Sequence, residues 1–210
     1  MMLFELLLIP LVTILFISLW NKGQGNVIFP ISSFIIGAIV FFPGIFLFYL
    51  FRGIFPLEFS SSALYLHFMW QDHLLHAVFS TTGLLIFRAF IQKTSHDNYS
   101  FRALAYYGGY YTLVSCFYFL ENLTHLNEYI LFILPLLHLS MVLCTSIAVS
   151  QFHSRDGLSR IFPILLLAVP IALFGLISTG PIQNSNFFPI VFSALAAGAS
   201  VFGFVRLKDY

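Results

Sequence analysis

Seven long apolar segments, separated by short polar breaks, constrain this chain more than any other feature of its sequence. A helix that crosses the hydrocarbon core of a bilayer, about 30 Å thick, needs about 20 predominantly apolar residues. Segments of about this length occupy residues 3–20, 27–51, 67–91, 102–123, 129–151, 161–179 and 187–206. We therefore predict an all-α polytopic membrane protein, with one transmembrane domain over residues 1–210 and about seven spanning helices.

The scarcity of charge supports the same fold class. Of the 210 residues, 60% are hydrophobic and only 8% are charged, whereas a soluble domain carries about 25% charged residues. Such a chain cannot cover a surface that faces water, so its expected partner is the lipid bilayer. The net charge of +1 gives no basis for a nucleic-acid partner. Cys116 and Cys144 lie inside apolar segments and are interpreted as small buried side chains.

The basic residues predict the orientation of the bundle. Only Arg52 falls on one side of the seven segments. The other side holds Lys22, Arg88, Lys93, Arg102, Arg155, Arg160, Arg206 and Lys208. Loops rich in Lys and Arg stay in the cytoplasm, which predicts an outside N-terminus and a cytoplasmic C-terminus. The first segment has Glu5 where a signal peptide needs a basic residue, so we expect a retained span.

Rare ionisable residues gather toward the predicted outer side. Asp72 and His76 lie in the outer half of the third segment, Glu121 and Asn122 at the outer end of the fourth, and His138 about 15 Å into the fifth. An ionisable group inside the membrane costs about 2.5–3.5 kcal/mol, and such groups usually face the bundle interior and pair with one another. In an α-helix, Asp72 and His76 would be i, i+4 neighbours. We therefore predict that these side chains share one pocket.

Two kinds of chemistry fit such a pocket. Asp72, His76, Glu121 and His138 offer the carboxylate and imidazole ligands of a divalent metal such as zinc, and the carboxylates could instead activate water as general bases. The alternative is that polar residues near helix ends turn to the interface or bond to one another.

Four tyrosines surround two glycines in the fourth segment. The run YYGGYY contains Tyr106, Tyr107, Tyr110 and Tyr111 on either side of the glycine pair. Small residues let membrane helices approach closely, so we interpret this run as helix packing rather than a ligand site.

The sequence FYFLEN at residues 117–122 resembles the second motif, Phe-x-x-x-Glu-Asn, of the PrsW-type intramembrane proteases in the CAAX-protease and bacteriocin-processing superfamily. The run ILPLLH, which ends at His138, is similar to the proline-preceded histidine of the third motif, and Gln71-Asp72 occupies the place of the Glu-Glu pair in the first. Leu75 stands where that motif has Lys. In the last motif, Phe174 and Ser178 replace His and Asp, so the chain resembles a degenerate member.

The resemblance implies an endopeptidase of the bacterial inner membrane that cleaves single-span, membrane-anchored substrates near the outer face. Asp72 and Glu121 would activate water, His138 would be a ligand or an oxyanion stabiliser, and Asn122 would orient the site. The motif losses favour a second reading, a catalytically inactive relative that binds transmembrane segments or partner proteins. A third reading is a haem or metal-transfer protein that uses His73, His76 and His138.

Overall fold

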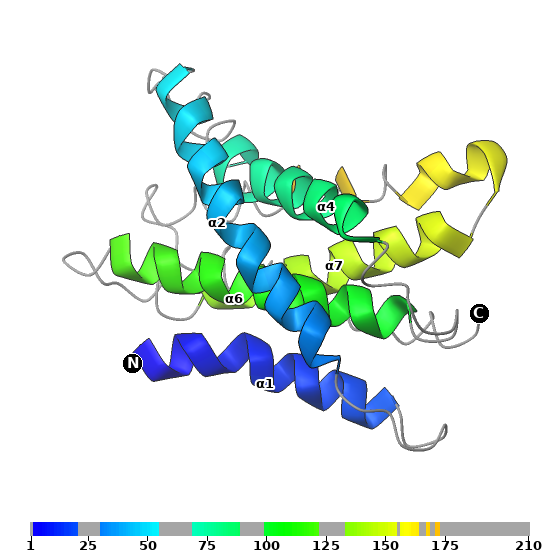
Figure 1. Cartoon of the computed structure of the whole chain (residues 1–210), viewed down its shortest axis with the longest axis horizontal. Coiled ribbons are helices and arrows are strands. Elements are labelled where there is room, and N and C mark those ends of the chain that lie inside the picture. The colour runs from blue at the N-terminus through cyan, green and yellow to red at the C-terminus, as the bar shows by residue number, and fades with distance from the viewer. Residues whose placement is uncertain are drawn as a thin grey trace.

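The described part of the chain is almost entirely helical and contains no strand. The computed structural model describes residues 2–20, 30–54, 69–88, 99–121, 133–154, 156–163, 167–168 and 171–172. The long helices are α1 (Met2–Trp20), α2 (Ile31–Ile54), α6 (Tyr99–Glu121) and α7 (Leu134–Ser154). A π-helix, η2 (Met69–Leu75), continues into α4 (His76–Ile86), and a short 3₁₀ turn, η6 (Gly157–Arg160), follows α7 (Figure 1).

These helices coincide with the first five predicted segments. The third segment differs from expectation, because its first part forms the π-helix η2 rather than an α-helix. Of the sixth predicted segment, 161–179, only short helical pieces are described, and the seventh, 187–206, lies outside the described residues. Cys116 is buried and Cys144 is partly buried, and the two form no disulfide within the part of the chain that the structure describes.

Helix α6 forms the centre of the bundle. It packs against α1, α2 and α7, and Figure 1 shows α2 crossing in front of it and α1 below it. Buried side chains occur along most of its length and on every side of it. A helix surrounded in this way carries no wide polar face, which explains why its tyrosines and small residues follow no amphipathic pattern.

Two glycines allow the backbones of α2 and α6 to touch. A Cβ placed on Gly37 of α2 would collide with the carbonyl oxygen of Tyr106, and one placed on Gly109 of α6 would collide with the carbonyl oxygen of Phe34. Both obstacles are backbone atoms, so no side-chain rotation could relieve them. The packing of Gly109 against the backbone of α2 agrees with the interpretation of YYGGYY as a helix contact.

Helices α2 and α6 run in the same direction. Phe34, near the start of α2, lies against Gly109, while Tyr49, near the end of α2, bonds to Glu121, the last residue of α6.

Helix α7 runs opposite to α6. The rings of Tyr99 and His153 are 4.7 Å apart at one end of the pair, and those of Tyr118 and His138 are 5.6 Å apart at the other.

Helix α4 runs opposite to both α2 and α6, because His76 packs near Phe48 and Tyr110 while Gly83 lies near Val40 and Tyr106. With α4 included, successive helices thus alternate in direction (Figure 1), as they do in a chain that crosses a bilayer repeatedly.

Two described helices are long and apolar enough to cross a membrane, Ile31–Phe51 and Leu134–His153. The outward face of α2 carries a continuous stripe of exposed apolar residues: Ile31, Ile35, Ile39, Phe42, Phe46 and Leu50. Soluble monomers rarely expose apolar patches this large, whereas lipid is a suitable solvent for them.

Hydroxyl groups inside the bundle bond to their own helices. The Thr13 hydroxyl donates to the Ile9 carbonyl at 2.7 Å, and the Thr112 hydroxyl donates to the Gly108 carbonyl at 2.6 Å. Helix α7 repeats this arrangement at Ser140, Thr145 and Ser146. A buried hydroxyl needs an acceptor, and each of these finds one four residues back along the chain.

Candidate functional site

Three of the polar residues predicted on the outer side, His76, Glu121 and His138, lie at one end of the bundle. The end of α2, the start of α4, the end of α6 and the start of α7 meet there around a group of aromatic rings. We call this group the aromatic cluster, and its members are Phe48, Tyr49, Tyr110, Tyr111, Phe117 and Tyr118. It surrounds His76 and His138 and extends to Glu121.

Glu121 ends helix α6 and is exposed. The hydroxyl of Tyr49, from the end of α2, donates a hydrogen bond to the Glu121 carboxylate. The Tyr49 ring in turn packs edge-on against Phe117, with the two centroids 5.9 Å apart. A carboxylate held in this way has a defined position and still lies at an accessible helix end, where water or a peptide could reach it.

His76 is the first residue of α4 and is fully buried. Its imidazole stacks on the ring of Phe48, with centroids 5.2 Å apart and planes 18° apart. Its Nδ1 shares a hydrogen bond with the Tyr110 hydroxyl at 3.1 Å. Its Nε2 has no hydrogen-bond partner among the described residues, although a buried ring nitrogen normally has one.

His138 lies in the second turn of α7 and is also fully buried. Its ring lies 6.0 Å from that of Tyr111 and 5.6 Å from that of Tyr118. Neither ring nitrogen bonds to any residue that the structure describes. His73 and His76 lie close enough to act on His138 electrostatically.

The structure therefore brings two of the predicted residues, His76 and His138, to the same aromatic ring. The Tyr118 ring contacts both imidazoles, with its centroid 6.0 Å from that of His76 and 5.6 Å from that of His138. Glu121 joins this group through Tyr49 and the aromatic rings, because its carboxylate accepts a hydrogen bond from Tyr49. The side chain of Asp72, and all of Asn122, lie outside the described residues.

A metal needs more ligands than these contacts supply. Structural zinc sites use four protein ligands, and catalytic sites use three with a water. Among the described side chains, no three of the His, Cys, Asp and Glu type stand close enough to hold a metal ion. His76 and His138 offer two imidazoles, and a zinc site that also uses Asp72 and Glu121 stays a prediction.

The π-helix η2 leads directly into this site. Its seven residues, Met69–Leu75, include His73, which is fully buried. In a π-helix each backbone bond spans five residues instead of four, so side chains follow a different angular spacing from that of an α-helix. The i, i+4 relation predicted between Asp72 and His76 therefore does not hold in its α-helical form. Short π-helical turns frequently occur at functional sites.

The central tyrosines bond as well as pack. Tyr106 donates to the Ser80 carbonyl at 2.8 Å, and the hydroxyls of Tyr107 and Thr81 are 3.0 Å apart. With the Tyr110–His76 bond, these contacts fasten residues 76–81 of α4 to residues 106–110 of α6. The sequence interpretation of YYGGYY included the packing but missed the hydrogen bonds, since nothing local predicts which hydroxyl meets which neighbour.

Three further members of the site were missed from the sequence. Tyr49, Tyr110 and Tyr118 touch the predicted residues, yet in a chain with 27 Phe and 10 Tyr no local signal separates them from ordinary packing residues. One signal was available for Tyr49, because it ends the second predicted span at the same membrane depth as Glu121.

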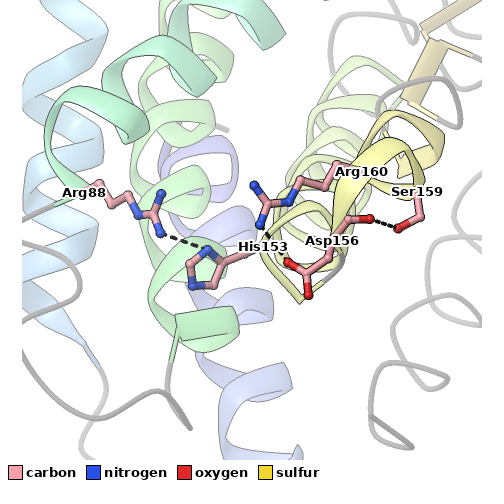
Figure 2. A network of polar contacts seen from close by, with 5 residues as sticks. All are labelled: Arg88, His153, Asp156, Ser159 and Arg160. Atoms are coloured by element: carbon pink, nitrogen blue, oxygen red, sulfur yellow. Dashed lines mark hydrogen bonds and ion pairs between the residues drawn. The ribbon is translucent and has the colours of Figure 1, made fainter.

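The opposite end of the bundle carries the basic residues. Arg88 follows α4 and donates from Nη2 to Nδ1 of His153 at 3.0 Å. Arg160 and Asp156 form an ion pair at 3.0 Å (Figure 2). Among the described residues, His76, His138 and Glu121 thus lie at one end of the bundle and Arg88 and Arg160 at the other, in line with the two sides that the sequence predicts.

Comparison of the chain with protein-family models, with curated proteins and with solved structures finds no match in any of the three.

Proposed function

We propose that this chain is a polytopic protein of the bacterial inner membrane with seven spans, an outside N-terminus and a cytoplasmic C-terminus. Three observations support the proposal. Helices α2 and α7 are long and apolar enough to cross a bilayer, and successive helices, with α4 included, alternate in direction (Figure 1). Arg88 and Arg160 lie at the end of the bundle that the charge bias assigns to the cytoplasm.

Within that architecture we propose a PrsW-like intramembrane endopeptidase that cleaves single-span substrates near the outer face. One observation carries this proposal: His76, Glu121 and His138 come from three different helices and are joined by one aromatic cluster. Buried ionisable groups in a bundle are costly and usually serve a function.

The chemistry assigned to these residues is general base catalysis. The Glu121 carboxylate, positioned by the Tyr49 hydroxyl, takes a proton from a water molecule whose oxygen attacks the scissile carbonyl carbon. The C–N bond then breaks, and the proton passes to the leaving amine. His138 stabilises the developing oxyanion, Asn122 orients the site, and Asp72 provides a second carboxylate.

One specific contact favours a second candidate function. The Tyr49 hydroxyl occupies a carboxylate oxygen of Glu121, which leaves that oxygen less available to accept a proton from water. A catalytically inactive relative would keep the bundle and bind a transmembrane segment or a partner protein without cutting it. The departures at Leu75, Phe174 and Ser178 agree with this candidate.

Glu121→Gln separates the two functions. A peptidase loses cleavage of a single-span reporter in reconstituted vesicles by at least about a hundredfold, the lower range for loss of a general base. Asp156→Asn makes the same change of charge at the other end of the bundle, where the carboxylate is 99% exposed, and should leave cleavage unchanged. If the protein is an inactive relative, neither the natural protein nor either variant cleaves the reporter, and the Glu121→Gln variant still binds it. Cleavage that persists in Glu121→Gln would contradict the catalytic assignment.

The metal content of the purified protein tests the predicted zinc site. We expect a bound divalent ion in the natural protein and its loss in Asp72→Ala and Glu121→Ala. A protein that cleaves without bound metal would limit the mechanism to general base catalysis.

A further inference from the structure

Two histidines inside the aromatic cluster have three ring nitrogens that lack a partner among the described residues. His76 and His138 are fully buried. Nε2 of His76 and both ring nitrogens of His138 form no hydrogen bond with any residue that the structure describes. Buried polar atoms are nearly always bonded to protein or to ordered water, because leaving them unpaired costs free energy. The three nitrogens therefore indicate a polar occupant inside the bundle.

The bond between Tyr110 and His76 determines which nitrogen of His76 carries the proton. The Tyr110 hydroxyl lies 3.1 Å from Nδ1 of His76, which is its one hydrogen-bond partner among the described residues. The same hydroxyl lies against Gly44, where an added Cβ would come within 2.9 Å of its oxygen. A buried hydroxyl needs an acceptor for its hydrogen, so Tyr110 donates to Nδ1. The proton of His76 is then on Nε2, which makes this nitrogen a buried N–H donor.

His138 needs a partner at both of its ring nitrogens. A neutral imidazole presents one N–H donor and one acceptor, and an imidazolium presents two donors. The rings beside it belong to Tyr111 and Tyr118, with centroids 6.0 Å and 5.6 Å from that of His138, and neither residue bonds to its nitrogens. Water both donates and accepts hydrogen bonds, so it fits either protonation state of the ring.

The surroundings favour water over a metal ion as the occupant. The described His, Cys, Asp and Glu side chains form no group of three that could hold a metal. A metal-binding imidazole must present a lone pair, whereas the unpartnered nitrogen of His76 carries a proton. A water oxygen accepts a hydrogen bond from that N–H group without any change of protonation.

The two histidines lie near each other. Both rings contact the ring of Tyr118, His76 acts on His138 electrostatically, and the two imidazoles do not bond directly. We propose that internal water binds to both ring nitrogens of His138 and continues as a short chain to the Nε2–H group of His76. His138 falls within the candidate span Leu134–His153, so this water lies beside the apolar part of α7.

The proposed water site changes the ligand set predicted from the sequence and does not depend on peptidase activity. Water at these nitrogens removes His76 and His138 from the predicted metal site and leaves the carboxylates of Asp72 and Glu121 as its remaining ligands. A peptidase inside a bilayer would draw on internal water, because each cleavage consumes one molecule. A protein that only binds membrane segments would keep the same water as part of its structure.

Water-edited solid-state NMR of the full-length protein in lipid vesicles, with isotope-labelled histidine and tyrosine, tests the proposal. Polarisation from water should reach the ring nitrogens of His76 and His138. Tyr106 gives the background level, because it is also fully buried but its hydroxyl donates to the Ser80 carbonyl. The nitrogen chemical shifts of His76 should show a proton on Nε2 and none on Nδ1.

Three variants of α7 show whether the water joins the two rings. His138→Leu should reduce the transfer to His76 to the level of Tyr106, because leucine forms no hydrogen bond. His138→Gln keeps a donor and an acceptor and should preserve the transfer. Ser140→Ala is the matched control: the lost hydroxyl already donates to the Leu136 carbonyl at 2.9 Å, so the transfer should stay unchanged.

Three results would overturn the proposal. The first is transfer to His138 no greater than to Tyr106 in the natural protein, which needs no variant and so decides the question even if His138→Leu does not fold. The second is unchanged transfer to His76 in His138→Leu, which would show that no water joins the two rings. The third is a stoichiometric metal ion that His138→Leu removes, which would assign the nitrogens to a metal. Absence of cleavage would leave all three measurements as they are.

Discussion

Replacing Gly37 by Ala should disrupt the contact between α2 and α6. The added methyl group would collide with the carbonyl oxygen of Tyr106, so the two helix backbones would have to separate. Overpacking typically costs about 1–3 kcal/mol, and the upper end applies here because the obstacle is backbone. Alanine regains about 1 kcal/mol of helix propensity over glycine, which leaves a net loss of about 2 kcal/mol.

Gly53, on the same helix, provides the matched control. No described atom lies within 4 Å of the position its Cβ would take, so Gly53→Ala should be neutral or stabilising by up to about 1 kcal/mol. The two variants should therefore differ by about 2–3 kcal/mol in the free energy of unfolding. Unfolding in mixed micelles with increasing sodium dodecyl sulfate, followed by tryptophan fluorescence, measures this difference. Equal stability of the two variants would refute the close backbone packing of α2 on α6.

Two further changes test the interior of the bundle by the same unfolding assay. Leu84→Ala should lower the free energy of unfolding by about 2 kcal/mol, the lower end for buried leucines, because lipid rather than water surrounds the bundle and only lost packing counts. Leu84 is fully buried, whereas its neighbour Leu85 is 54% exposed, so Leu85→Ala should have little effect. A similar loss of stability at both positions would contradict the assigned faces of α4. Tyr106→Phe should cost about 1 kcal/mol by removing the hydrogen bond to the Ser80 carbonyl, and an unchanged stability would show that this bond contributes nothing net.

The apolar runs predicted the helices well, because length and composition alone decide whether a segment can serve as a span. The expected ranges 3–20 and 102–123 closely match α1 and α6. Helix α6 begins at Tyr99, earlier than expected, and Tyr99 packs on His153 of α7. The π-helix η2 was not predicted, because its backbone spacing depends on contacts that neighbouring sequence does not encode.

The candidate site was only partly predictable. Topology was enough to expect His76, Glu121 and His138 at one end of the bundle. Topology did not predict the environments of these residues: His138 is fully buried, whereas Glu121 is exposed and bonded to Tyr49. Burial of this kind depends on how rings from four helices interlock. The rings belong to a chain so rich in phenylalanine and tyrosine that its sequence does not single out the ones involved.

The hydroxyls that bond within their own helices have a consequence for how the chain tolerates mutation. Thr13, Thr112 and Thr145 each donate to a carbonyl one turn back, so removing such a hydroxyl orphans no group on another helix. Exchange with valine or alanine should then be nearly silent wherever the volume fits. Variation at these sites among related chains would thus reveal little about which helices touch, whereas variation at Gly37 or Gly109 would be informative.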